Sequence, residues 1–201
     1  MLSSSSSRSA KNSQQRHNRS RSLRANPKLK PAKSFLPPLS NPPPIEPVEI
    51  PHITWDDFSA IPDRNSPWAA HTYWDIRYWY RAEFTKGGQN IQMNVTCKLN
   101  SNTSWVKRRE DKLLSHERGH YLIGWICALE FKKRVKETRL SPLYYATEIR
   151  TIFKETLDEY LQWEILYDHE TDHYKNTANQ LKWNIMIAKR LDQLREYLEN
   201  P

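Results

Sequence analysis

One motif constrains this chain more than any other: His116-Glu117-x-x-His120, set in the apolar stretch 113–129. Positions i and i+4 of a helix lie one above the other on the same face, so both imidazoles can reach one metal ion. Glu117 lies one step round from His116, close enough to address a water on that ion. The motif therefore predicts a zinc hydrolase site with two His ligands and a Glu general base.

The alternative is a solvated helix face that carries two ordinary histidines. The flanks of the motif argue against it, because they are apolar and predict that this turn of helix faces the interior: Leu113, Leu114, Ile123, Ile126, Cys127 and Leu129. Two unpartnered His and a Glu are costly to bury, and a bound metal removes that cost. We therefore expect a metal at this turn.

The formal charge of +8 is concentrated at one end of the chain. Residues 1–45 hold nine of the 31 Lys and Arg and none of the 23 Asp and Glu, which leaves 22 basic against 23 acidic residues in 46–201. A nucleic-acid-binding core is therefore not implied. We expect residues 1–50 to be a disordered tail, basic and then Pro-rich, and 51–201 to be one domain. The tail is suited to contact with anionic surfaces, and its Arg- and Ser-rich composition also fits an organelle transit peptide or a Ser-rich export signal.

The cellular setting is weakly constrained. Cys97 and Cys127 lack the spacing of a metal site or a disulfide framework, and we expect both to be small buried hydrophobes. No apolar run of about 18 residues is present, so no transmembrane helix is predicted. The N-terminus lacks the apolar region of a classical secretory signal, which predicts a cytoplasmic location by default.

Hydrophobic periodicity predicts an α+β fold. Residues 71–100 alternate apolar and polar side chains around Lys86-Gly87-Gly88-Gln89 and predict a β-hairpin with one buried face. The motif helix is expected to begin near Asn102-Thr103-Ser104 and to run to about Lys136. A second helix should open at Ser141-Pro142, and a third should span about 174–198. We expect the small antiparallel sheet to pack on the motif helix, with the two further helices completing the core.

A second chemical stretch lies between the second and third expected helices, at Tyr167-Asp168-His169-Glu170-Thr171-Asp172-His173. It contains another pair of His at i and i+4 with three interleaved carboxylates. A catalytic zinc needs a third protein ligand and an open position for water, and this stretch is the obvious donor. The alternative is a polar loop whose acids cap the next helix.

Together these residues resemble an uncharacterised bacterial family of predicted secreted zinc-dependent proteases. That family pairs HExxH with a later Tyr-Asp-x-x-Thr-x-His, here 167–173, followed by Gln-x-x-Trp, here 180–183. Thr54-Trp55-Asp56-Asp57-Phe58 and Ser104-Trp105-Val106 are similar to further landmarks of the family, which usually has Gly where this chain has Tyr174. The resemblance covers about residues 50–195 and implies a zincin-like fold.

The resemblance also implies roles for individual residues. His173 matches the family histidine and is our choice of third zinc ligand beside His116 and His120, with Asp168 as the reserve ligand or as a carboxylate that orients a ligand histidine. Tyr167, His169 and Tyr174 remain alternatives for the donor that stabilises the oxyanion.

We therefore expect a zinc-dependent metallopeptidase that acts on a peptide or protein, with Glu117 as general base and Zn²⁺ as cofactor. A hairpin strand at the sheet edge is expected to hold an extended peptide. Two rival classes keep the same residues: a zinc hydrolase of a non-peptide bond, and a non-catalytic zinc-binding structural or interaction protein.

Overall fold

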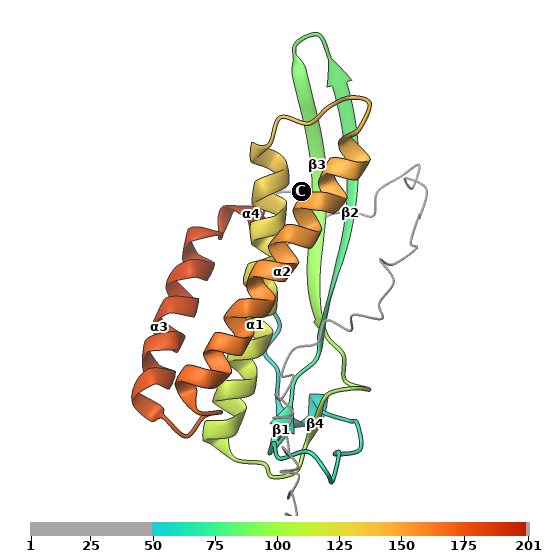
Figure 1. The fold of residues 1–201 in the computed structure, drawn as a ribbon. Coiled ribbons are helices and arrows are strands. Elements are labelled where there is room, and N and C mark those ends of the chain that lie inside the picture. Colours follow the sequence, from blue (N-terminus) through green and yellow to red (C-terminus); the bar gives the residue numbers. More distant parts are fainter. Residues whose placement is uncertain (1–49, 200–201) are drawn as a thin grey trace, which may run out of the picture.

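The structure, a computed structural model, describes residues 50–199 and has an α+β architecture (Figure 1). Except for Ile50, the tail predicted for residues 1–50 lies outside the described residues. The elements, in chain order, are a 3₁₀ turn η1 (Trp55–Asp57), β1 (Ala70–His71), β2 (Trp74–Thr85), β3 (Gly88–Leu99), β4 (Trp105–Val106), α1 (Asp111–Glu137), α2 (Tyr145–Thr171), α3 (Thr177–Gln193) and α4 (Glu196–Glu199). Within residues 50–199, no helix combines the length and the apolar character needed to cross a membrane.

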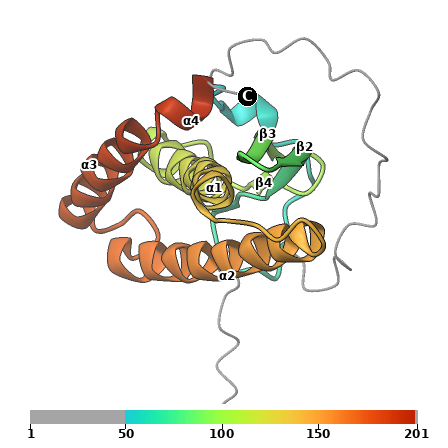
Figure 2. The same ribbon diagram turned by 90° about the horizontal axis from the view of Figure 1, so that it is seen from above.

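The helix that carries the motif, α1, is the centre of the molecule. It contacts β1, β2 and β3 as well as the three other helices, and Figure 2 shows it enclosed by α2, α3 and the hairpin. The burial of its side chains agrees with this position, because almost every residue from His116 to Val135 is buried. A helix that buries all of its sides must have neighbours on all of its sides.

The β2–β3 hairpin confirms the predicted alternation. The strands pair in antiparallel register from Trp74 opposite Leu99 to Thr85 opposite Gly88. Ile91, Met93, Val95 and Cys97 are buried, whereas the residues between them are exposed or partly exposed. His71 and Thr72, which we had placed in the hairpin, precede it. His71 belongs instead to β1, which pairs with Trp105 of β4 in a second two-stranded sheet.

Four expected helix ends were wrong. The chain at 105–106 pairs as β4, so α1 begins at Asp111 rather than near Ser104, whose hydroxyl instead accepts a hydrogen bond from the Tyr73 amide. A turn that follows Ser141 delays α2 to Tyr145. The third helix begins at Thr177, where the Asn176 side chain caps it by accepting from the Asn179 amide, and it ends at Gln193.

Gly124 of α1 allows the hairpin to pack closely against the motif helix. A Cβ at this position would lie 2.6 Å from Cδ2 of Trp74 and 2.9 Å from Sγ of Cys97. Both are buried parts of the hairpin, so they have little room to move.

We predict that Gly124→Ala lowers the free energy of unfolding by about 1–3 kcal/mol through overpacking, although Ala favours a helix over Gly by about 1 kcal/mol. Urea denaturation measures the change. Gly87→Ala is the matched control, because a Cβ there meets nothing closer than 3.7 Å and should change stability by about 0.5 kcal/mol or less. Equal effects of the two substitutions would contradict the close packing.

Candidate metal centre

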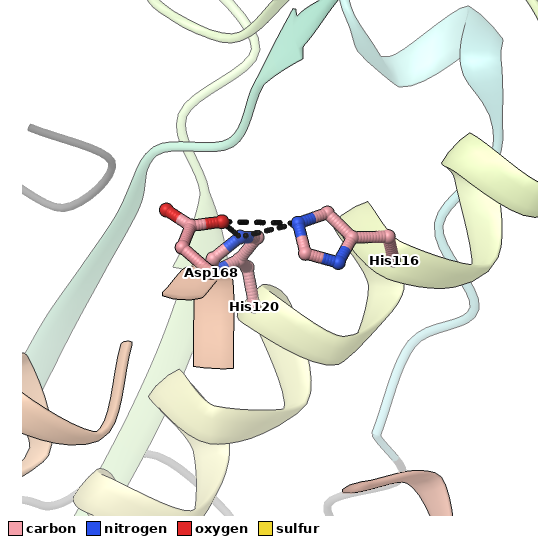
Figure 3. A group of neighbouring side chains, drawn as sticks. All are labelled: His116, His120 and Asp168. Atoms are coloured by element: carbon pink, nitrogen blue, oxygen red, sulfur yellow. Dashed lines mark hydrogen bonds and ion pairs between the residues drawn. The ribbon is translucent and has the colours of Figure 1, made fainter. Parts of the chain in front are cut away.

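Three buried side chains from two helices meet beside α1. The Nε2 atoms of His116 and His120 lie 3.1 Å apart, and Oδ1 of Asp168, on α2, lies 3.1 Å from each of them (Figure 3). The motif spacing places both imidazoles on one face of α1 as predicted, and α2 brings the carboxylate over that face. Within residues 50–199 these three side chains form a group whose donor atoms could hold one metal ion.

The outer nitrogens of both imidazoles face hydrogen-bond acceptors. Nδ1 of His120 contacts the Glu164 carboxylate, and Nδ1 of His116 lies 3.1 Å from Oε1 of Gln180. The Gln180 amide is oriented by its own NH₂ group, which donates to Tyr167 and to Asn184. With a proton on each Nδ1, these contacts would leave both Nε2 lone pairs facing the centre. This is the tautomer that a metal ligand needs.

The residues that carried the family resemblance gather around His116. Tyr167 donates its hydroxyl proton to the His116 carbonyl at 3.0 Å, and its ring stacks on the imidazole at 4.6 Å. Gly119 makes this possible, because a Cβ there would collide with the Tyr167 ring. The Thr171 hydroxyl lies 3.4 Å from Nδ1 of His116, and the Trp183 ring packs against Tyr167.

The charge balance of the cluster favours a cation. Glu117, Glu164 and Asp168 are all buried, at 4, 0 and 6 % exposed. Burial by itself raises the pKa of Asp168, but His120 and the hydrogen bonds from His116, His120 and His173 outweigh it and hold this pKa well below its ordinary value. Burial raises the pKa of Glu164 to about 7 against the opposing effect of His120.

Glu164 and Asp168 in turn affect the pKa of His120. Burial by itself lowers the pKa of His120, whereas Glu164 and Asp168 raise it well above its ordinary value. No Lys or Arg of the described chain lines the pocket beside the cluster. A metal ion would supply the positive charge while both imidazoles stay neutral.

The distances also suit a metal. A tetrahedral ion with bonds of roughly 2.0–2.1 Å separates its ligand atoms by roughly 3.3–3.4 Å, close to the 3.1 Å sides of this triangle. Two imidazole nitrogens and one carboxylate oxygen form a donor set that zinc accepts. Neither Cys97 nor Cys127 belongs to the group, and both are buried as free thiols.

Glu117 lines a pocket that opens beside the triangle. The Glu117 Oε2 atom accepts a hydrogen bond from the Thr72 hydroxyl at 2.5 Å. Its Oε1 makes no hydrogen bond to any part of residues 50–199, which leaves it for a molecule in the pocket. The pocket is lined by Trp68, Ala69, Ala70, His71, Leu113, His116, Glu117, His120, Asp168, His173 and Tyr174.

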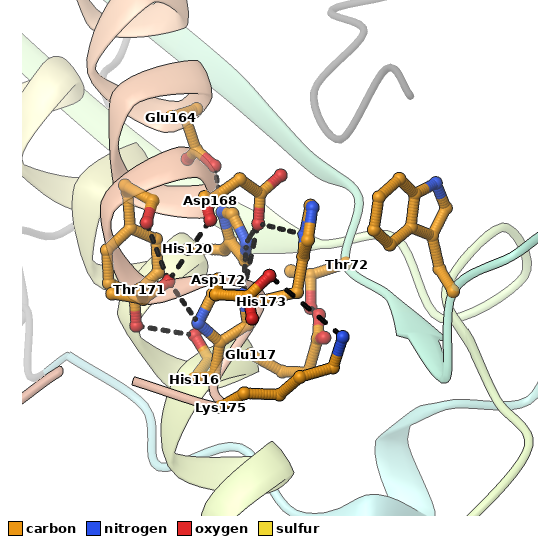
Figure 4. A network of polar contacts seen from close by, with 12 residues as sticks. Thr72, His116, Glu117, His120, Glu164, Asp168, Thr171, Asp172, His173 and Lys175 are labelled. Atoms are coloured by element: carbon orange, nitrogen blue, oxygen red, sulfur yellow. Dashed lines mark hydrogen bonds and ion pairs between the residues drawn. The ribbon is translucent and has the colours of Figure 1, made fainter. Parts of the chain in front are cut away.

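The second chemical stretch is mostly helix, which corrects its expected place between the second and third helices. α2 continues to Thr171, so Glu164 and Asp168 stand one helical turn apart and both face α1. This explains why Asp168, the reserve choice, is the residue that meets the two histidines. His173 follows the helix, with its Nδ1 atom 3.1 Å from Oδ1 of Asp168 (Figure 4). The centroid of its ring lies 3.7 Å from that of Trp68. His173 touches the carboxylate without joining the three converging atoms.

The three alternatives for an oxyanion donor occupy different places. Tyr167 is fully buried and its hydroxyl already donates to the His116 carbonyl. His169 is exposed on α2 and does not line the pocket. Tyr174 lines the pocket, and its phenol oxygen accepts from Nη2 of Arg108 at 3.1 Å, which leaves the phenol proton free. The geometry therefore favours Tyr174 among the three.

A left-handed run of backbone places His173 and Tyr174 at the pocket. Asp172, His173 and Tyr174 have φ values of 45°, 49° and 75°. Such a conformation costs a residue with a Cβ about 1–2 kcal/mol. A bulky residue held there against this cost marks a candidate functional position.

Three neighbours of the cluster were missed from the sequence. Glu164 could have been found, because it precedes Asp168 by four residues on the helix that α2 proves to be. Thr72 and His71 gave no local signal, since they reach the cluster only through the pairing of β1 with β4. His71 is buried, its Nε2 has no partner within the described chain, and burial together with the charge of His120 lowers its pKa to about 4.

The fold and the cluster define an α+β protein built around a His₂–carboxylate group that can hold a metal ion. Residues 45–174 match the family described as "Bacterial protein of unknown function (DUF922)", and the chain belongs to this family. The match confirms membership of a bacterial family, while its description assigns neither zinc nor proteolysis. No curated protein and no solved structure matches the chain.

The strain at Tyr174 gives a prediction that needs no activity assay. Tyr174→Gly should be about 1–2 kcal/mol more stable than Tyr174→Ala, because both lose the ring but only Ala keeps a Cβ in the left-handed region. Thermal or urea denaturation measures the difference. The control pair is Leu181→Gly and Leu181→Ala, at an exposed position inside α3, where the order should reverse by about 1 kcal/mol. The same order at both sites would contradict the left-handed backbone.

Proposed function

We propose that this chain is a zinc-dependent metallopeptidase in which His116, His120 and Asp168 hold the ion and Glu117 is the general base. One observation carries the proposal: three lone-pair donors converge at 3.1 Å from one another beside a buried carboxylate that keeps one oxygen free. A structural zinc site is normally closed by four protein ligands, whereas a catalytic one has three and an open position. The adjoining pocket supports the open, catalytic type.

The protein groups have distinct tasks in this proposal. The bound ion would supply Lewis acidity, which lowers the pKa of a water and polarises the scissile carbonyl. Glu117 would accept the proton of the attacking water on Oε1 and later deliver it to the leaving amine. Tyr174 would donate its phenol proton in a hydrogen bond to the oxyanion, and Arg108 would hold the phenol in place. Glu164 and Gln180 would keep the two imidazoles oriented.

An extended wall beside the cluster supports a peptide as substrate. Trp68, Ala69 and Ala70 line the pocket together with His71. Within the described residues β1 pairs with β4 alone, and in this proposal an extended peptide would add to its second edge. This assigns substrate binding to β1 rather than to the hairpin strand expected from the sequence, because no residue of β2 or β3 lines the pocket.

The ligand assignment can be tested by metal affinity. We predict that Asp168→Ala lowers zinc affinity by more than about 100-fold, whereas His173→Ala lowers it by about 10–100-fold at most, the range typical of residues that contact a metal ligand. Competition with a chromophoric chelator measures both. His169→Ala is the matched control and should bind zinc as the wild type does, since this histidine is exposed. Loss of zinc in His173→Ala alone would restore His173 as the third ligand.

The catalytic role of Glu117 is tested by Glu117→Gln, which keeps the size of the side chain but cannot take a proton. The variant should fold and bind one equivalent of zinc, and it should lose about 10²–10⁴-fold in kcat on a peptide cleaved by the wild type. A peptide library first identifies that substrate, and chelator followed by zinc must abolish and restore the turnover. Retention of wild-type turnover in Glu117→Gln would place the base elsewhere. Absence of cleavage by the zinc-loaded wild type would favour a non-peptide substrate or a non-catalytic zinc protein.

A further inference from the structure

The hydrogen bond from Thr72 to Glu117 joins two parts of the molecule that are 45 residues apart in the sequence. The Thr72 hydroxyl lies 2.5 Å from Oε2 of Glu117, and the two residues are 3 % and 4 % exposed. Figure 4 shows Thr72 approaching the Glu117 carboxylate from the side of the cluster opposite Glu164. A hydroxyl that donates to a carboxylate in a buried setting forms a charge-assisted bond of the strong kind.

Thr72 is itself held firmly in place. The residue before it, His71, pairs with Trp105 of β4. The residue after it, Tyr73, accepts from the Asn100 amide at 2.8 Å and donates its own amide to Oγ of Ser104 at 2.9 Å. The position of the hydroxyl is therefore set by backbone contacts on both sides, and a rigid group of this kind can restrict the side chain that it binds.

The bond leaves the Glu117 carboxylate with a defined direction. Because Oε2 is occupied by Thr72, Oε1 is the oxygen left for the pocket that Glu117 lines together with His116, His120 and Asp168. Without the hydroxyl, this carboxylate would have no hydrogen-bond partner among the described residues and could turn about its side-chain torsions. A general base must lie within hydrogen-bond reach of the proton that it takes, so it becomes less efficient when its side chain is free to turn.

We propose that Thr72 is a positioning residue that orients the general base Glu117 toward the pocket and fixes it relative to β1. This inference rests on the function proposed above. Thr72 touches neither substrate nor ion and acts only through Glu117. The bond also holds the carboxylate at a fixed position relative to Ala70 and His71, which line the pocket and directly precede Thr72. An extended chain on β1 would therefore meet the base at a constant distance.

Three substitutions in the full chain test the proposal. Thr72→Val preserves the shape of the side chain and removes the hydroxyl, so kcat should fall by about 10–100-fold while KM and zinc stoichiometry stay near wild type. Thr72→Ser restores the hydroxyl, so kcat should return to within about 5-fold of the wild type. This is a smaller loss than the one expected for Thr72→Val. The third variant, Glu117→Ala, is used for stability alone. Urea denaturation of the purified proteins should show that Thr72→Val and Glu117→Ala are non-additive, because the two residues share one bond.

The outcomes separate this inference from the proposed function. An active wild type whose Thr72→Val variant keeps full kcat, or whose Ser and Val variants lose kcat equally, overturns the role of Thr72 and leaves the metallopeptidase proposal intact. Additive stability effects overturn the contact itself. A zinc-loaded wild type that cleaves no peptide overturns the proposed function and the positioning role together, whatever the stability measurements show.

Discussion

The burial of three carboxylates beside two histidines is the constraint on which the rest of the structure depends. Charged groups removed from water are tolerated only when partners satisfy them, and here the partners come from several elements. Glu164 and Asp168 come from α2, Gln180 from α3, and Thr72 from the segment between β1 and β2. The elements around α1 therefore enclose an apolar helix and also complete the polar contacts of its first turns.

Close approach between α1 and its neighbours makes these contacts possible. Gly119 lets the Tyr167 ring lie against the motif turn, and Gly124 lets the hairpin lie against the next turns. The first glycine brings α2 near enough for Asp168 to reach both Nε2 atoms. The left-handed run at 172–174 then turns the chain back over the pocket before α3 begins. Strain at these three residues is the local cost of this return, and it is retained beside the candidate site.

The sequence was informative where a pattern is local and periodic. The alternation of Ile91, Met93, Val95 and Cys97 predicted the hairpin, and the apolar flanks of HExxH predicted a buried helix. Helix ends were less predictable, because Ser104 and Ser141 are good capping residues that the fold uses for other hydrogen bonds. The choice between Asp168 and His173 depended on where α2 ends, and no local pattern marks that end. Thr72 could not be predicted, since its contact with Glu117 is made by tertiary structure alone.

The central claim is that two histidines and one carboxylate hold a zinc ion with a position left open, and X-ray absorption at the zinc edge of the purified protein tests it most directly. Our account predicts two imidazole nitrogens at roughly 2.0–2.1 Å together with oxygen donors at roughly 2.0–2.2 Å, and no sulfur. One of the oxygens should belong to an exchangeable water, and the oxygen contribution should change when Asp168 is replaced. A third imidazole, a sulfur ligand, a shell closed by four protein donors, or purified protein that does not take up zinc would contradict the account.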